Sequence, residues 1–236
     1  MKIRFKFSKH GPVKFIGHLD IMRYFQKAMR RAEVDIKYSE GFSPHQIMSF
    51  AAPLGVGLTS NGEYMDIEVN SMSDTKTMLE QLNAVMVEGI KVTECHILSD
   101  QAKNAMSLVA AADYTLAFRE GKEPDNLAEF FNGLKTFLDQ PQILITKKTK
   151  KGEKEVDIKP WIYDLSVEDE TIFIKVSAGS SDNLKPELLM EAYYNWLGKI
   201  MPEFAFEIQR EEVYGDVGDE EKRVLLPLGL IGEACE

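Results

Sequence analysis

Three of the four histidines fall within the first 45 residues, at positions 10, 18 and 45. An imidazole titrates near neutral pH, so it can carry a proton or ligate a metal ion. Asp20 lies two residues after His18 and adds a carboxylate. We therefore expect His18, Asp20 and His45 to form a polar centre, which recognises a nucleotide or acts as general acid and base.

Other roles stay open for these residues. A carboxylate in the first turn of a helix is favoured by the helix dipole, and this would explain Asp20 without catalysis. The spacing of His10, His18 and His45 matches no standard metal motif, and structural or solvent-exposed histidines are the commoner case. No metal ion and no other cofactor is predicted, and the sequence does not decide whether the chain is an enzyme.

Basic side chains are concentrated in the same part of the chain. Residues 1–50 contain ten Lys and Arg against four Asp and Glu, although the whole chain carries a net charge of −10. A local basic surface can bind RNA phosphates even when the acidic remainder repels them. The expected RNA contacts are Arg4, Lys6, Arg23, Lys27, Arg30 and Arg31. The alternative is a pair of solvated faces, since the first strand shows no pair of exposed aromatics for base stacking.

A loop rich in glycine, serine and proline precedes His45. Such loops present side chains at the edge of a sheet, and a glycine also permits a tight entry into the helix expected at His18. The loop residues considered functional are Gly17, Ser39, Gly41, Phe42 and Pro44.

The first half of the chain alternates between strand and helix patterns. Residues 2–8 alternate apolar and basic side chains, which predicts a strand, and residues 18–33 have apolar side chains three and four apart, which predicts a helix. Strand pieces are expected at 36–38, 47–50, 64–69 and 90–98, and a helix capped by Asp74 at 74–87. This order is that of the split βαβ, or ferredoxin-like, arrangement.

The second half repeats the order. Strands are expected at 114–118, 171–177 and 204–213, strand pieces at 143–146 and 155–165, and helices at 124–138 and 186–197. We predict an α+β fold of two tandem ferredoxin-like (βαββαβ) units, with antiparallel sheets and helices on one face. The units span 1–98 and 113–214, with a linker at 99–112 and a C-terminal tail at 215–236. Helices on one face would leave Lys2, Arg4 and Lys6 on an open face.

Composition excludes several classes of protein. Apolar residues make up 44% and charged residues 28%, as in globular proteins. The N-terminus lacks the apolar stretch of a signal peptide, and no apolar run is long enough to span a bilayer, so we expect a cytoplasmic protein without a membrane partner.

No P-loop, nucleophile elbow or dinucleotide fingerprint is present in the sequence. A DNA partner is not expected.

Several short blocks together resemble one family. They are Phe15–Arg23, Arg30–Ala32, Tyr38–His45, Pro53–Gly55 and Glu63–Asp66, with Glu155–Pro160 further along. These blocks are similar to those of the radical-SAM-linked (radical-SAM-associated) domain family of unknown function. The resemblance is specific over residues 2–70 and looser beyond.

The resemblance implies a protein that works beside a radical SAM enzyme. The chain itself is not that enzyme, because Cys95 and Cys235 are its only cysteines and the iron–sulfur cluster needs more. The family has no established catalytic residues, so none is carried over.

The leading hypothesis is an accessory factor that binds RNA or takes part in RNA processing or modification. The alternative is a protein-interaction subunit that docks a radical SAM enzyme, without nucleic acid, through the basic helix and the apolar tail segment Leu225–Ile231. A third hypothesis is a metal or small-molecule enzyme that uses His10, His18 and His45.

Overall fold

The chain divides into two units of contacting residues. The computed structural model describes residues 1–149, 152–180, 182–219 and 221–232. Unit 1 comprises Met1–Ala111 and the chain from Arg210 onward, and unit 2 comprises Ala112–Gln209. The second unit is therefore an insertion in the sequence of the first. Cys235 lies outside the described residues.

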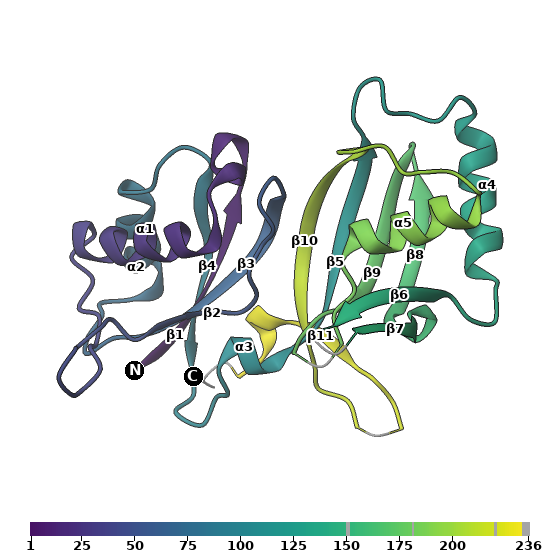
Figure 1. Ribbon diagram of the computed structural model, residues 1–236. Coiled ribbons are helices and arrows are strands. Elements are labelled where there is room, and N and C mark those ends of the chain that lie inside the picture. Colours follow the sequence, from purple (N-terminus) through teal and green to yellow (C-terminus); the bar gives the residue numbers. More distant parts are fainter. Residues whose placement is uncertain (150–151, 181, 220, 233–236) are drawn as a thin grey trace. The chain divides into compact units, whose positions relative to one another are not determined.

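The sheet of unit 1 is antiparallel. Its elements are β1 (Lys2–Lys9), the short 3-10 helix η1 (Gly11–Phe15), α1 (His18–Arg31), β2 (Met48–Phe50), β3 (Thr59–Glu68), α2 (Thr75–Ala84) and β4 (Ile90–Leu98). β1 pairs with both β3 and β4, and β2 pairs with β3, so the strand order is β4-β1-β3-β2. Both α1 and α2 cover the same side of these strands (Figure 1).

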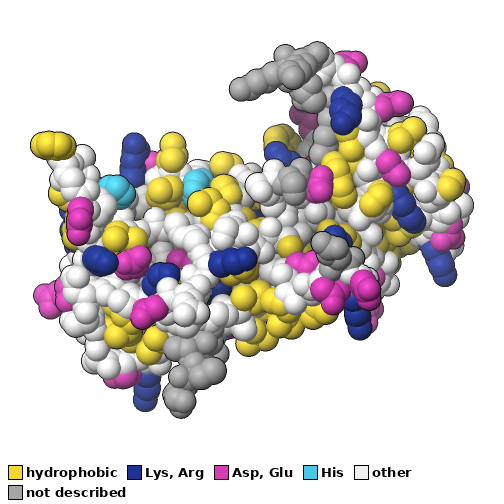
Figure 2. All heavy atoms as spheres, turned by 90° about the horizontal axis from the view of Figure 1, so that it is seen from below, with side chains coloured by type: hydrophobic (Ala, Val, Ile, Leu, Met, Phe, Trp, Pro, Cys, Tyr) yellow, Lys and Arg dark blue, Asp and Glu magenta, His cyan; other side chains and the backbone are white. Residues whose placement is uncertain are grey.

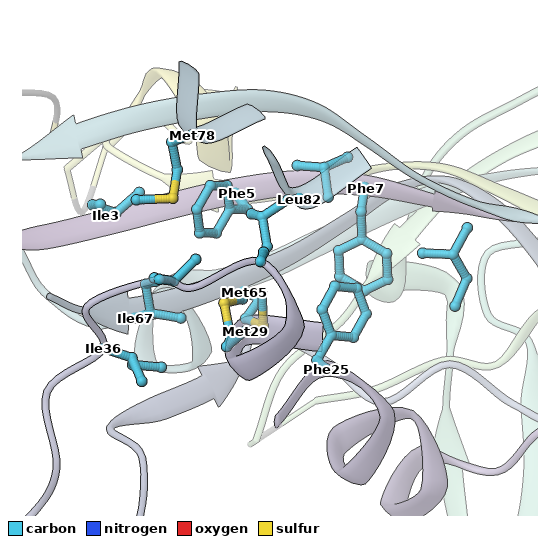
Figure 3. Packing of buried hydrophobic residues seen from close by; sticks show 14 of the residues in the cluster. Ile3, Phe5, Phe7, Phe25, Met29, Ile36, Met65, Ile67, Met78 and Leu82 are labelled. Atoms are coloured by element: carbon cyan, nitrogen blue, oxygen red, sulfur yellow. The ribbon is translucent and has the colours of Figure 1, made fainter. Parts of the chain in front are cut away.

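Alternation in β1 produces the core of this unit. Side chains two residues apart on a strand share a face, so Ile3, Phe5 and Phe7 all point toward the helices and are buried. The ring of Phe7 packs on Phe25 of α1, with centroids 4.8 Å apart, and Figure 3 shows this pair beside the Met29 and Met65 side chains. Burial of each such side chain contributes roughly 1.5–3 kcal/mol.

The ends of the two helices follow local rules. The Asp74 side chain accepts a hydrogen bond from the amide of Thr77, which confirms the predicted cap of α2. The hydrogen bonds from Thr77 lower the pKa of Asp74. α1 ends at Arg31, two residues before the predicted end, because Glu33 adopts a left-handed φ of 54° that a helix cannot continue.

The C-terminal segment belongs to unit 1. The strand β10 (Phe206–Asp216) pairs with the short strand β11 (Leu225–Pro227), which leads into the 3-10 turn η3 (Leu228–Leu230). Buried Arg210 pairs with Glu63 of β3 and donates to the carbonyl of Ala52. The residues from Arg210 onward group with unit 1, whereas the prediction placed the chain up to 214 in the second unit.

The main strands of unit 2 pair in the order β10-β5-β9-β8. Its other elements are β5 (Val109–Phe118), which starts in unit 1, α4 (Leu127–Leu138), β6 (Leu144–Thr149), β7 (Gly152–Asp157), the 3-10 turn η2 (Lys159–Trp161), β8 (Ile162–Glu168), β9 (Thr171–Ser177) and α5 (Pro186–Trp196). Rings of α4 and α5 pack together, with Phe130 and Phe137 against Tyr193.

Two expected elements of unit 2 are corrected. The strand expected at 155–165 is broken at Lys159–Trp161, because Pro160 has no amide hydrogen and turns the chain. As a result β6 and β7 pair as a separate two-stranded sheet. α4 starts at Leu127 rather than near 124, because the Asn126 side chain caps the amide of Glu129.

The protein is therefore a mixed α+β fold with mostly antiparallel strands. Among the described residues there are five helices, and one of them is the one-turn α3 (Ala105–Leu108), which lies within the segment predicted as a linker. In the described ranges, no helix is both long enough and apolar enough to cross a membrane.

Replacing Gly89 with alanine is expected to lower the free energy of unfolding by about 2–4 kcal/mol. Gly89 has a φ of +92°, its carbonyl accepts from the amide of His10 at 2.7 Å, and a Cβ there would overlap the carbonyl oxygen of His10. Urea unfolding of the purified variant measures the loss.

Gly57→Ala is the matched control for this test. Gly57 has a similar φ of +90°, but a Cβ there would meet no atom within 4 Å. We expect a loss of about 1–2 kcal/mol from backbone strain alone. Equal losses at the two positions would show that crowding at Gly89 contributes nothing.

Candidate nucleic-acid interface

The outer face of α1 carries an exposed row of cations. Ile21, Phe25 and Met29 are buried on the inner face. The helical repeat then turns the other side of the helix to solvent. Exposed on that side are Arg23, Lys27, Arg30 and Arg31, all predicted from the sequence.

Most of these cations lack an acidic partner. Arg23 lies 3.3 Å from the Asp20 carboxylate, and both side chains are exposed. Arg30 donates to the backbone carbonyl of Gln26, and Arg31 to that of Val85. Within the described part of the chain, Lys27, Arg30 and Arg31 have no carboxylate at ion-pair distance, so their charge is available to an anionic ligand.

Arg4 does not lie on an open face, contrary to the prediction. It is fully buried. Its Nε and Nη2 donate to the two carboxylate oxygens of Asp66, at 2.7 and 2.9 Å. The guanidinium also donates to the carbonyls of Leu228, Ile231 and Lys103. The C-terminal segment covers this side of the sheet, so Arg4 cannot contact phosphate.

Lys6 is also engaged inside unit 1. Its Nζ lies 2.7 Å from Glu212 and 3.3 Å from Glu94. Burial alone would lower the pKa of Lys6, but hydrogen bonds and charges of these two carboxylates together raise it. Burial likewise acts to raise the pKa of Glu94, which His96 and Lys6 nevertheless hold below its ordinary value. Because two carboxylates already surround Lys6, its predicted role as a phosphate contact is corrected.

Ser39 and His45 close the predicted motif loop. The Ser39 Oγ lies 2.8 Å from His45 Nδ1 and accepts from the His45 amide at 3.1 Å, while the Ser39 amide donates to the His45 carbonyl. Gly41 adopts a φ of +109°, which favours glycine. Phe42 stands at the tip, fully exposed, and Pro44 is exposed beside it.

The base of this loop is attached to α1. The Gln46 side chain donates to the carbonyl of Gln26 at 3.2 Å and to the Tyr38 hydroxyl at 3.4 Å. Tyr38 is 46% exposed. Tyr38 was not predicted as a site residue, although it begins the block Tyr38–His45. Cations and exposed aromatic rings on one surface suit single-stranded nucleic acid.

The predicted polar centre is not assembled. His18 lies edge-on to the ring of Phe50, with centroids 5.5 Å apart, and lines a cavity of about 20 Å³. Asp20 is exposed on α1, and His45 lines a separate cavity of about 310 Å³. In the described residues no hydrogen bond, ion pair or ring contact joins any two of the three. Gly17 has an ordinary φ of −70°, so its position does not require glycine.

The described residues also hold no cluster of three His, Cys, Asp or Glu side chains suited to a metal ion. His10, for example, contacts Asn61, with Nε2 and Oδ1 2.9 Å apart. Burial raises the pKa of the Cys95 thiol to about 12, so this cysteine is a poor nucleophile.

Lys9 is a buried cation that the sequence did not predict. Lys9 is 3% exposed and donates to the carbonyl of Ile16, directly before α1. Burial lowers the pKa of Lys9, partly opposed by the charge of Glu63, which pairs with Arg210. The sequence did contain a signal for this burial, because the alternation along β1 places Lys9 on the same inward face as Phe5 and Phe7. This group fixes the start of α1.

The comparisons with known proteins identify a family. Residues 2–186 match the family model described as "Uncharacterized protein conserved in bacteria (DUF2344)", so the chain belongs to this family. Among curated proteins, none matches the chain.

Two solved structures show a distant likeness. One is the crystal structure of a Cbf5-Nop10-Gar1 complex, with 13% identity and a TM-score of 0.45 over 89% of this chain. The present chain spans about half of that chain, 49% of its length. The other is an unknown protein from Galdieria sulphuraria, with 12% identity and a TM-score of 0.25, covering 90% of this chain and 98% of that chain.

Arg4→Met is expected to lower the free energy of unfolding by about 3–5 kcal/mol, because it leaves the Asp66 carboxylate buried without its counter-charge. Chemical denaturation measures the loss. The control is Lys2→Met on the same strand and face, where Lys2 donates only to the carbonyls of Asp100 and Ala102. We expect a loss of about 1 kcal/mol there. Equal losses would contradict the structural role of Arg4.

Proposed function

We propose that this member of the DUF2344 family is an accessory factor in RNA processing or modification that binds RNA through α1. One observation carries the proposal. Lys27, Arg30 and Arg31 project from one helix without carboxylate partners among the described residues, and two exposed aromatic rings lie on the adjoining loop. Cations supply affinity for the phosphate backbone, and aromatic rings supply stacking surfaces.

The binding surface is local. The net charge of −10 opposes a broad nucleic-acid interface. On the face seen in Figure 2, Lys and Arg side chains are interspersed with Asp and Glu side chains and form no continuous basic area. The proposed interface is therefore the row of cations on α1 together with the loop at residues 38–46.

The separation of the candidate catalytic residues favours binding over cleavage. General acid–base catalysis needs its groups within hydrogen-bond reach of one substrate. His18 packs against Phe50 and His45 is bonded to Ser39. We therefore assign His45 and Ser39 to holding the loop, and Asp20 to pairing with Arg23 at the start of α1.

The architecture is proposed to consist of two ferredoxin-like (βαββαβ) units. The strand orders β4-β1-β3-β2 and β10-β5-β9-β8 support this assignment, since each is the 4-1-3-2 order of the split βαβ arrangement. The β6–β7 pair would then be an insertion in the second unit. Fold alone says nothing of function, so the RNA proposal rests on α1 and the loop.

A second function is favoured by a different surface. Phe15, Leu19 and Val56 are each more than 60% exposed. A hydrogen bond of 2.8 Å from the Gly57 amide to the Lys14 carbonyl holds their two segments together. We propose that these exposed apolar side chains form a patch for protein docking. The partner implied by the sequence resemblance is a radical SAM enzyme. The tail segment Leu225–Ile231 is not part of this surface, because it packs on its own unit.

The double variant Lys27→Glu/Arg30→Glu is expected to weaken RNA binding by about tenfold or more at roughly 0.1 M salt. Two phosphate contacts would be lost, so the slope of log K against log salt should become shallower by about 1.4–1.8. Fluorescence anisotropy with labelled RNA at several salt concentrations measures both quantities.

Lys122→Glu/Lys199→Glu provides a control with the same change in net charge. Both lysines are exposed and lie in unit 2. Equal weakening by the two double variants would mean that only net charge matters, and unchanged binding in the α1 variant would refute the RNA proposal.

The docking function predicts that Phe15→Ser/Leu19→Ser abolishes co-purification with a radical SAM protein after nuclease treatment, because it removes two exposed apolar side chains from the patch. Affinity purification followed by mass spectrometry measures the loss. Lys27→Glu/Arg30→Glu is the control and should keep the complex. A complex that survives the apolar substitutions would exclude this patch as the docking surface.

A further inference from the structure

We infer that Phe42 is a stacking platform for an unpaired base, so that the ligand of the α1 surface is single-stranded RNA. This inference rests on the proposed function and adds the class of RNA and the residue that selects it.

The two ends of the loop around Phe42 are bonded to each other. Three hydrogen bonds link Ser39 and His45 at its two ends, and a β-bridge joins Tyr38 to Gln46 directly below. A ring on a braced loop loses little conformational freedom on binding, which favours affinity. Ser39 and His45 are positioning residues in this arrangement.

The ring of Phe42 is exposed to solvent and does not belong to the core of unit 1. Its relative exposure is 112%, the largest among the exposed apolar side chains. Burying a side chain of this size would stabilise the fold by roughly 1.5–3 kcal/mol, and the exposed ring does not contribute this stabilisation. The fold gains nothing from this ring, so its use lies in contact with a ligand.

The surroundings of Phe42 favour a base over a protein pocket. Its neighbours are Glu40, Gly41, Ser43 and Pro44, all exposed, and none adds an apolar surface of the size found around Phe15. Protein docking concentrates several apolar anchors in one patch. Stacking needs a single π face, and every base has one.

The RNA strand must be unpaired, because the bases of a duplex are stacked on each other and cannot stack on Phe42. In an RNA duplex the bases stack on each other, and proteins contact mainly phosphates and 2′-hydroxyls. The loop is attached to α1 at Gln26, between Arg23 and Lys27. A single strand can therefore place phosphates on the α1 cations and one base on Phe42.

The test measures binding of a labelled single-stranded oligonucleotide of mixed sequence and of the corresponding duplex to the full chain. Phe42→Ala and Phe42→Leu are both expected to weaken single-strand binding by about 5- to 150-fold. Phe42→Tyr and Phe42→Trp should bind as the parent does, and duplex binding should be unchanged throughout. Oligonucleotides carrying 2-aminopurine should lose fluorescence on binding the parent but not Phe42→Ala.

Phe15→Ala is the matched control, because Phe15 is a second exposed phenylalanine of unit 1, at 67%. It should bind RNA as the parent does. Normal single-strand binding by Phe42→Leu would overturn the inference while leaving the role of α1 intact. Failure of the parent to bind either RNA would instead refute the proposed function. Loss of a protein partner, with RNA binding unchanged, would assign Phe42 to a protein pocket.

Discussion

The arrangement of unit 1 depends on one buried guanidinium. Arg4 sits in the first strand and joins Asp66 of β3 to carbonyls at Lys103, Leu228 and Ile231. A buried arginine is tolerated only when its planar set of donors is satisfied, and here carboxylate and carbonyl oxygens do so. The same interaction fixes the segment after β4 and the segment after β10 against the sheet. It thereby covers the part of this sheet face around Arg4.

The proposed binding surface lies on the helical side of unit 1 and on the loop at residues 38–46. The same sheet that buries Arg4 presents Ile3, Phe5 and Phe7 to α1, and this packing leaves the other face of α1 to its cations. Gln46 joins the base of the loop, which carries Tyr38 and Phe42, to the helix that carries the cations. The apolar patch at Phe15 lies at the other end of α1, and one helix therefore offers two chemically different surfaces.

Local patterns predicted most elements of unit 1 but not the pairing of its charges. Alternation in β1, helical spacing in α1 and the cap at Asp74 all depend on residues within a few positions of each other, and the structure confirms them. Arg4 looked solvated because its partners are 62 and 224 residues away. Lys9 was missed although its partner, the carbonyl of Ile16, is only seven residues away. The exposed cations of α1 were predicted correctly because helix amphipathicity is itself local, whereas the convergence of His18, Asp20 and His45 required long-range geometry.

The bonds of Arg4 to the carbonyls of Leu228 and Ile231 also set an order of assembly. Arg4 leaves the ribosome well before its partner at Leu228, which follows 224 residues later. Unit 2 is continuous in the sequence and can be completed while the first strand still lacks these carbonyls. Domains generally fold as units as they emerge during synthesis. The nascent chain thus carries an unfinished first unit while unit 2 is synthesised, and the Arg4 guanidinium stays in water until the segment at Leu228 arrives.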